Sequence, residues 1–314
     1  MYISEEVVRE HLRYEALIPA IGAALTDWTE GRVEQPARTI LRAGNAEGVL
    51  NGWFAVMPVI AGDVMGVKTV TFYPGNAAHK LPTHMAVVEL LRRATGEPLA
   101  VMDGRLITEM RTAAVSAVAF MALAPRVFAE TPRTLGILGS GVQAQAHLEA
   151  LKHVWPERDG LRVWSPTREH AERLAARWGG KATTLEEAAG ADVVLTVTSA
   201  AQPVLRGAWL KPNSLVLAVG ATGATMRELD DETLLGATVI AEARSCVERE
   251  SGDVRLSGAT VAAEIGEILN GSKSGVVTRG KRAVFKTVGM AIEDLTAARL
   301  VWERLEAERP ASMR

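Results

Sequence analysis

A pair of glycines directly after an apolar run constrains the fold of this chain more than any other feature. Residues 134–138 (Thr-Leu-Gly-Ile-Leu) are typical of a buried strand, Gly139-Ser-Gly-Val-Gln-Ala144 follows at once, and a helical pattern runs over 143–153. This order opens a dinucleotide-binding unit, because the second glycine lets the backbone approach a pyrophosphate and the small Ala144 allows close helix packing. The predicted phosphate contacts are Gly139, Ser140, Gly141, Val142 and Gln143.

Short apolar runs and helical patterns alternate from residue 132 to about residue 284. Alternation of this kind predicts a parallel, doubly wound sheet of the Rossmann type, with helices on both faces. The predicted strands are 134–138, 161–164, 192–198, 214–219 and 238–242. The predicted crossover helices are 143–153 and 167–178, the second with Ser165 as its N-cap and Pro166 at its first position.

The first 130 residues follow a different pattern, which reads as α+β. A helix is predicted at 14–29, strands at 37–41, 52–57, 64–70 and 84–91, and a long helix at 108–123 that ends near Pro125. A last helix, 291–308, is expected to pack back on this part of the chain. We therefore predict an α/β protein in which residues 1–127 with 288–314 form one domain and residues 128–287 form the Rossmann domain.

The bulk properties restrict the partners. The chain has 314 residues, 48% hydrophobic and 23% charged, and a formal charge of -2, which fits two globular domains and gives no electrostatic case for nucleic acid. Cys246 is the only cysteine, the first residues do not show the basic and apolar regions typical of a secretory leader, and apolar stretches such as 113–124 are shorter than the roughly 20 residues of a membrane span. We expect a cytoplasmic protein without a membrane anchor. The six histidines show no metal-ligand spacing, so no metal is predicted.

The segment after the second predicted strand bears on the choice of coenzyme. An NAD enzyme normally presents Asp or Glu there to the adenosine ribose, whereas this chain has Trp164-Ser165-Pro166-Thr167-Arg168. Two hydroxyls and a guanidinium suit a 2′-phosphate, so Ser165, Thr167 and Arg168 favour NADPH, with NAD still possible. The plainer interpretation is that these residues are helix caps and a solvated arginine.

Three basic residues in the first part stand at the ends of apolar runs: Arg38, Lys68 and Arg111. A lone Arg or Lys near a strand is most often on the surface, and spacing alone does not show that these three converge. The aromatic and aliphatic residues Trp53, Phe54, Val56 and Phe72 are candidates to shape a pocket, although such residues near strands are more often core.

Several separate motifs, taken together and in this order, are specific. They are Gln35-Pro-Ala-Arg-Thr39, Val56-Met-Pro58, Lys68-Thr-Val-Thr-Phe-Tyr73, Ala100-Val-Met-Asp-Gly104, Arg111-Thr-Ala-Ala-Val-Ser-Ala117, Ile137-Leu-Gly-Ser-Gly-Val-Gln143, Arg227-Glu-Leu-Asp-Asp231, Glu250-Ser-Gly-Asp253 and Phe285-Lys-Thr-Val-Gly-Met290. Over nearly its full length the chain resembles the ornithine cyclodeaminase/mu-crystallin family, and within it the mu-crystallin-type ketimine reductases.

The resemblance implies that Arg38, Lys68 and Arg111 surround the carboxylate and the reacting nitrogen of an amino or imino acid, with Val56 also lining the substrate site in the cleft between the domains. It implies that the first domain binds substrate and forms a homodimer. The coenzyme contacts that it implies beside the phosphate loop are Thr83, His84, Met85, Arg111, Thr112, Thr198, Val219, Ala221 and Thr287.

Two departures from the cyclodeaminases bear on the reaction. Thr222 stands where those enzymes have an acid/base Asp, and Ala55 stands where they have a Glu for the distal amine of ornithine. A threonine hydroxyl is no general base near neutral pH, so these departures favour NADPH-dependent reduction of cyclic ketimine carboxylates. Lys68 is the first candidate proton donor, with His84 or a water second. Two alternatives stay open: a cyclodeaminase or amino-acid dehydrogenase that uses NAD, and an NADPH-dependent protein that binds small molecules of the thyroid-hormone type.

Overall fold

The computed structural model describes residues 2–44 and 50–309, except the side chain of Leu50. The chain divides into two compact units, residues 1–111 with 290–314 (unit 1) and residues 112–289 (unit 2). The division falls within helix α3 (Arg105–Val127), whereas the sequence placed it after residue 127. The helix is continuous past Thr112, so the pattern of secondary structure gives no break at this point.

Unit 1 is built on a seven-stranded sheet in the order β1-β7-β6-β5-β4-β2, with β3 paired to β4. Neighbouring strands are antiparallel except β1 and β7. The strands are β1 (Tyr2–Ile3), β2 (Val33–Glu34), β3 (Thr39–Gly44), β4 (Leu50–Ala61), β5 (Val64–Phe72), β6 (His84–Arg92) and β7 (Pro98–Asp103). The sheet confirms the α+β prediction for this part and adds β1, β2 and β7, which the sequence did not predict.

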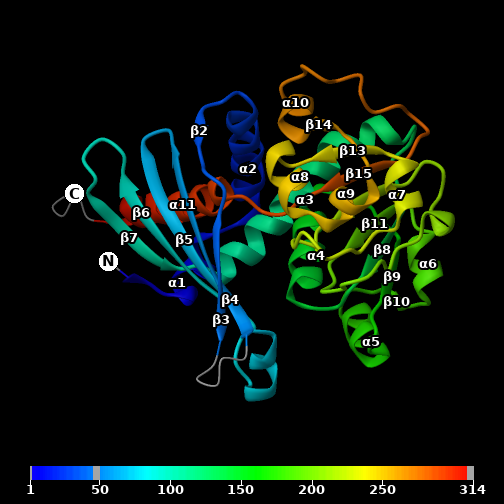
Figure 1. Cartoon of the computed structure of the whole chain (residues 1–314), viewed down its shortest axis with the longest axis horizontal. Coiled ribbons are helices and arrows are strands. Elements are labelled where there is room, and N and C mark those ends of the chain that lie inside the picture. The colour runs from blue at the N-terminus through cyan, green and yellow to red at the C-terminus, as the bar shows by residue number, and fades with distance from the viewer. Residues whose placement is uncertain (1, 45–49, 310–314) are drawn as a thin grey trace. The chain divides into compact units, whose positions relative to one another are not determined.

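One face of this sheet is covered by helices. Helix α11 (Ala291–Glu308) packs on β4, β5 and β6 and lies beside α2 (Tyr14–Thr29), as Figure 1 shows. Side chains alternate between the two faces of a strand, so along β5 Val64, Lys68 and Val70 lie on the helix-covered face. Unit 1 also contains α1 (Glu5–His11) and a short 3-10 helix, η1 (Pro74–His79).

Unit 2 is an eight-stranded parallel sheet in the order β10-β9-β8-β11-β12-β15-β13-β14. The strands are β8 (Thr134–Leu138), β9 (Gly160–Trp164), β10 (Lys181–Ala182), β11 (Val193–Thr196), β12 (Leu215–Ala218), β13 (Thr238–Ala241), β14 (Val261–Glu264) and β15 (Ala283–Lys286). The chain proceeds from β8 to β9 on one side and later to β11 on the other. This reversal beside β8 is where such sheets bind dinucleotides, at the carboxyl ends of their strands.

The helices of unit 2 connect these strands. They are the later part of α3, α4 (Val142–Val154), α5 (Arg168–Arg177), α6 (Leu185–Ala189), η2 (Gly207–Trp209), α7 (Asp231–Leu235), α8 (Arg244–Glu250), α9 (Gly252–Ser257) and α10 (Ile265–Leu269). The predicted Rossmann-type α/β fold is confirmed. The buried strands β8, β11 and β12 are mostly apolar, apart from Thr134 and Thr196, as expected for strands covered on both faces.

The predicted start of the second crossover helix was wrong. Helix α5 begins at Arg168 with Thr167 as its N-cap, so Ser165 is not the cap and Pro166 is not the first helical residue. Helix α3 begins at Arg105, earlier than the predicted residue 108, and ends at Val127, close to Pro125 as predicted. By length and composition alone, α3 could cross a membrane. However, 83% of its most apolar stretch is buried inside the protein, as in the core helix of a soluble protein.

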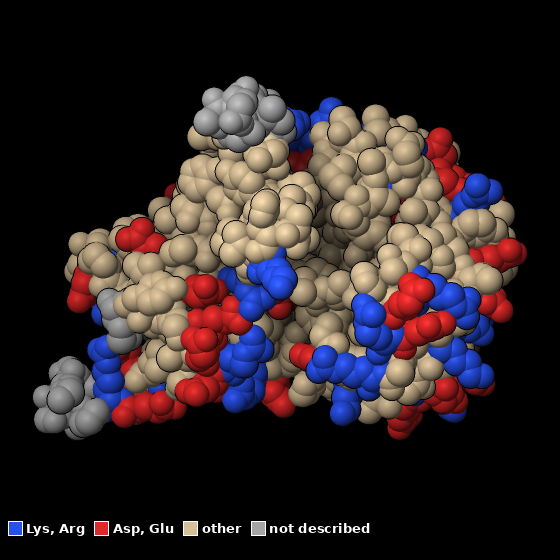
Figure 2. All heavy atoms as spheres, turned by 90° about the horizontal axis from the view of Figure 1, so that it is seen from below, with Lys and Arg blue, Asp and Glu red and all other residues tan. Residues whose placement is uncertain are grey.

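Charged side chains of both signs are interspersed on the face drawn in Figure 2, where blue and red spheres lie next to one another. Ion pairs at the surface of the protein include Arg133 with Asp159 and Arg299 with Asp63. This mixture matches the small formal charge of -2.

Candidate active site

The glycine turn lies between β8 and α4, as the sequence predicted. Gly139 has φ +119, a conformation that favours glycine, and its amide donates to the carbonyl of Trp164 at 2.9 Å. A Cβ at this position would lie 2.7 Å from the carbonyl oxygen of Val197. Gly139 is therefore required by the protein's own packing.

Gly141 is a glycine for a different reason. It is the N-cap of α4 with an ordinary φ of -80, and a Cβ there would meet no atom within 4 Å. Nothing in the protein itself calls for glycine, so the open space at the start of this helix fits a pyrophosphate that approaches the backbone. Val142, the next residue, is 59% exposed, and Gln143 continues the helix.

The residues proposed for the 2′-phosphate follow β9 beside this turn. The Ser140 hydroxyl donates to the hydroxyl of Ser165 at 2.9 Å, which links the phosphate loop to the segment after β9. Arg168 is exposed and pairs with Glu172 on the next turn of α5 at 2.8 Å. Thr167 caps α5 by position but makes no side-chain cap bond.

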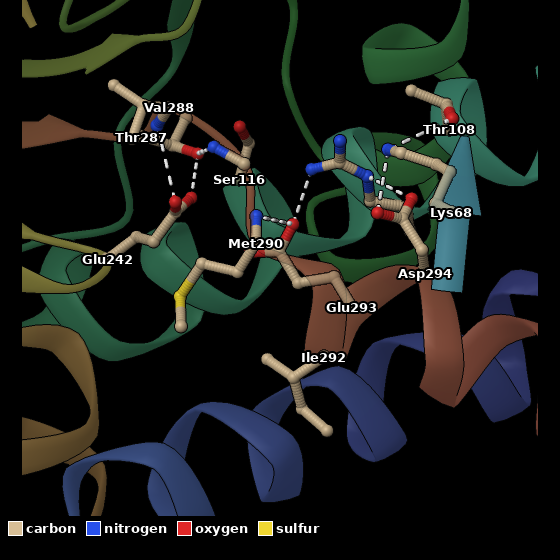
Figure 3. Close-up of polar contacts among 12 residues, drawn as sticks. Lys68, Thr108, Ser116, Glu242, Thr287, Val288, Met290, Ile292, Glu293 and Asp294 are labelled. Atoms are coloured by element: carbon tan, nitrogen blue, oxygen red, sulfur yellow. Dashed lines mark hydrogen bonds and ion pairs between the residues drawn. The ribbon is translucent and has the colours of Figure 1, made fainter. Parts of the chain in front are cut away.

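The other coenzyme candidates of unit 2 lie just after strand ends. Thr198 follows β11, Val219 and Ala221 follow β12, and Thr287 follows β15. The Thr287 hydroxyl donates to the buried carboxylate of Glu242, which also accepts from the amide of Val288 at 3.3 Å (Figure 3). Carboxyl ends of parallel strands share one edge of the sheet, so the topology brings these residues to the same edge as the glycine turn. Thr112, by contrast, lies on α3.

A cluster of buried charges lies in unit 1, where α11 begins. The Lys68 ammonium is 2.6 Å from Oδ2 of Asp294, and Arg111 donates from Nε to Oδ1 of Asp294 at 3.0 Å and from Nη1 to Glu293. Figure 3 shows Lys68 pointing from β5 toward Asp294, with Glu293 beside it. Glu293 also accepts from the amide of Met290 at 3.2 Å, so the same carboxylate caps the helix and binds Arg111.

The electrostatics of the cluster show that the three predicted cations influence one another. Burial lowers the pKa of Lys68 to about 8. The Asp294 carboxylate opposes this lowering, and the positive charges of Arg111 and Arg38 add to it. The amide of Ile292 on α11 donates to Gln35 at 2.9 Å, which ties the segment that carries Arg38 to the same helix start. Lys68 therefore holds a proton at neutral pH that it can release more easily than an ordinary lysine.

His84 lies on the same face of the sheet as Lys68. Burial, together with the charges of Lys68 and Arg111, lowers its pKa to about 4, so it is neutral at physiological pH. Thr83 precedes β6, and its carbonyl accepts from the amide of Tyr73 at 2.8 Å. Met85 is 41% exposed on the opposite face, because neighbouring residues in a strand alternate.

Val56 does not join the cluster. It pairs with Thr69, the neighbour of Lys68, and its side chain therefore lies on the opposite face of the sheet. Ala55 does lie on the Lys68 face, where it is 1% exposed. Trp53 and Phe72 stack with ring centroids 5.7 Å apart on that same face, so of the four pocket candidates these two share it.

The sequence did not predict Asp294 and Glu293 as site residues. Two adjacent acidic residues at the start of a helix are common, because their negative charge interacts favourably with the helix dipole. Their near-complete burial reveals a second role, because Glu293 is 0% and Asp294 1% exposed. Among the described residues, no group of three His, Cys, Asp or Glu side chains could hold a metal ion.

Comparison with known proteins places the chain in a family. The model of the ornithine cyclodeaminase/mu-crystallin family matches residues 1–309. The chain belongs to this family. A ketimine reductase mu-crystallin of Mus musculus is 42% identical over 312 residues, which cover 96% of either chain. Nicotinamide-dependent oxidoreductases are thus its relatives, and the prediction of such an enzyme is confirmed.

Two solved structures of the family share the fold over almost the whole length. A Thermococcus litoralis Δ1-pyrroline-2-carboxylate reductase, in complex with NADH and L-proline, has a TM-score of 0.88 and 30% identity and covers 98% of either chain. An archaeal alanine dehydrogenase dimer with bound NAD has a TM-score of 0.91 and 26% identity, with coverage of 98% of this chain and 96% of the other.

Proposed function

We propose that this chain reduces the C=N bond of cyclic ketimine carboxylates with NADPH and forms cyclic amino acids. The observation that carries the proposal is the buried cluster of Lys68, Arg111 and Asp294, which combines an anion site with a proton donor. Reduction adds a hydride to the imine carbon and a proton to its nitrogen. Bound NADPH supplies the hydride in such a reaction.

Arg38 and Arg111 hold the substrate carboxylate. A guanidinium has five N–H donors, so an arginine anchored by acidic side chains can also bind a substrate anion. The three cations and the two carboxylates named in the cluster leave one formal positive charge, which a substrate carboxylate neutralises. Because Glu293 and Asp294 orient Arg111 in advance, little ordering remains to be done when substrate binds.

Lys68 protonates or orients the imine nitrogen. An acid works best when its pKa lies near the working pH, and the pKa of Lys68 is lowered to about 8. His84 is a poor second candidate, because its pKa of about 4 leaves it without a proton at neutral pH. The acid is thus assigned to Lys68, with His84 as a neutral neighbour that contacts the coenzyme or substrate.

The coenzyme is held by the turn Gly139–Gln143 and by residues after the ends of neighbouring strands. We assign the 2′-phosphate of NADPH to Ser165, Thr167 and Arg168. The surface pair of Arg168 with Glu172 is of a kind worth about 0–1 kcal/mol, so the guanidinium can turn toward a phosphate at small cost. NAD(H) is the alternative coenzyme, and the two structures compared above are described with bound NAD and NADH.

Deamination of ornithine is disfavoured by two residues. Thr222 offers no carboxylate for acid/base work, and the buried Ala55, on the face that carries Lys68, leaves the distal amine of ornithine without a partner. Neither residue hinders a substrate that lacks a distal amine.

A panel of substrates tests this function. The protein would be assayed with five- and six-membered cyclic ketimine carboxylates, with pyruvate plus ammonia, and with ornithine, in each case with both nicotinamide coenzymes. We expect NADPH oxidation that requires a ketimine carboxylate. Ammonia release from ornithine with NAD would instead establish a cyclodeaminase, and retention of ligand without turnover would establish a binding protein.

We also propose that the chain forms a homodimer through the face of the unit 1 sheet that α11 leaves uncovered. This face carries Leu41, Met85 and Val87, which are 57%, 41% and 40% exposed. A row of apolar side chains on an open sheet favours association, and the archaeal relative is described as a dimer. Sedimentation equilibrium of the purified protein would give twice the mass of the chain; a monomer would refute this assignment.

A further inference from the structure

A buried carboxylate of unit 2 has no part in the reaction proposed above. Glu228 follows the loop after β12 and belongs to the motif Arg227–Asp231. Its side chain is completely buried, where an ionised group is costly unless it is well partnered. Burial raises the pKa of Glu228, while the Lys286 ammonium and hydrogen bonds from Thr198 and Thr196 lower it.

The partners of Glu228 come from two loops. Oε1 accepts from the amide of Thr198 at 2.6 Å, just after β11. Oε2 accepts from the amides of Gly220 at 2.7 Å and Ala221 at 3.2 Å, just after β12, and from the Thr196 hydroxyl at 2.8 Å. One carboxylate therefore ties together the loops that leave two adjacent strands at the coenzyme-binding edge.

The backbone of Glu228 is held in turn by Asp253. Its own amide and that of Leu229 donate to Oδ1 of Asp253 at 2.8 and 2.9 Å. Oδ2 of Asp253 lies 3.3 Å from the Lys286 ammonium at the end of β15, and both of these side chains are fully buried. The carboxylate is thereby fixed relative to a third strand end.

Gly220 fits this arrangement closely. A Cβ at this position would overlap with the backbone of Thr198 and with the Glu228 carboxylate. The two loops approach one another closely here, and the Glu228 carboxylate accepts from the backbone of both. A shift of the carboxylate would therefore move the backbone of both loops.

We propose that Glu228 is a positioning residue that sets the backbone of these two loops for the nicotinamide half of the coenzyme. In a doubly wound sheet the two halves of a dinucleotide lie on either side of the reversal, and β9 with its Ser165 segment lies on the other side from β11 and β12. Thr198, Val219 and Ala221, predicted as coenzyme contacts, are in or next to the loops that Glu228 holds. This inference rests on the proposed dinucleotide site but not on the identity of the substrate.

The test compares two ligands on the full-length protein. NADPH contains the nicotinamide, whereas 2′,5′-ADP contains only the adenosine half. Glu228→Gln keeps the size of the side chain but replaces an acceptor oxygen by a donor that faces N–H groups. We expect Kd for NADPH to rise about 10- to 100-fold, as for loss of hydrogen bonds to a charged group, with Kd for 2′,5′-ADP unchanged. Glu232→Gln, an exposed change on α7, is the control and should alter neither constant.

A second, milder variant tests the same proposal in case Glu228→Gln does not fold. Thr196→Val removes one buried hydroxyl donor and leaves the three amides, so the loss of NADPH affinity should be smaller and equally selective. The role of Glu228 would be overturned if the Kd values for NADPH and 2′,5′-ADP rose equally. It would also be overturned if the Kd for NADPH did not change in a variant that thermal melting shows to be folded. Failure of wild-type protein to reduce ketimines would refute the substrate assignment instead, and it would leave this comparison intact.

Discussion

Oδ2 of Asp294 lies 2.6 Å from the ammonium nitrogen of Lys68, and both side chains are almost completely buried. The other oxygen of the same carboxylate accepts from Nε of Arg111 at 3.0 Å. A single carboxylate thus holds two cations and opposes the lowering of the Lys68 pKa that burial causes.

The first prediction concerns pH. Reduction needs Lys68 in its protonated form, so log kcat/KM for a ketimine carboxylate should be constant below pH 8 and fall with unit slope above it, through the pKa of about 8. An ordinary lysine would place this limb above pH 10. Rates would be measured at pH values on both sides of 8. The pKa of the substrate would be determined separately, to show that its ionisation does not cause the fall in kcat/KM. A profile that stays flat well above pH 8 contradicts Lys68 as the acid.

The second prediction concerns Asp294. Asp294→Asn removes the charge that favours the protonated form of Lys68, so the alkaline limb should move to lower pH by about one pH unit or more. Asp63→Asn is the matched control, because Asp63 pairs with Arg299 on the same helix at the surface. An unmoved limb in Asp294→Asn would mean that this carboxylate does not govern the acid.

The third prediction separates two glycines of the phosphate turn. Gly141→Ala should lower the melting temperature of the coenzyme-free protein only slightly, since alanine is a weaker N-cap than glycine but the added Cβ meets no protein atom, and it should raise Kd for NADPH about tenfold or more. Gly139→Ala should destabilise the free protein, because it has φ +119 and a close neighbour in Val197. Thermal melting and coenzyme fluorescence measure the two effects. Normal NADPH affinity in Gly141→Ala would exclude the pyrophosphate from this turn.

The fourth prediction concerns coenzyme choice. Arg168→Ala should raise KM for NADPH roughly 10-fold or more while KM for NADH changes little, because only the former carries a 2′-phosphate. Arg173→Ala, an exposed change on the same helix, serves as the control. Steady-state kinetics with both coenzymes decide the matter. Equal effects on the two would assign Arg168 to the solvated helix face instead.

The sequence predicted the fold class of unit 2, because β8, β9, β11, β12 and β13 are apolar runs between helical patterns. It did not predict β10, β14 and β15, which are short. Helix α2 and helix α11 were predicted with the bounds that the structure has, since their apolar spacing is regular. The two-domain division was harder to predict, because α3 continues across it without a break. Strand β7 was not found because its alternation is short and begins with a proline.

The candidate site was only partly predictable, because its partners are distant in sequence. Lys68 and Arg111 were named, but the acids that hold them come from the last helix, and no local pattern connects positions so far apart. Val56 was grouped with the site, although strand alternation puts it on the other face from Lys68. Glu228 stood in a quoted motif, yet its four donors become apparent only when β11 and β12 lie side by side.

Hydride transfer to the carbon of a C=N bond can be followed with an isotope label on the coenzyme. The protein would be incubated with a cyclic ketimine carboxylate and NADPH that carries deuterium at the transferable position of the nicotinamide, and the product analysed by mass spectrometry and NMR. We expect a cyclic amino acid with one deuterium on its α-carbon. Product without deuterium at that carbon, or coenzyme that keeps its label while the protein is folded and saturated, would contradict the account.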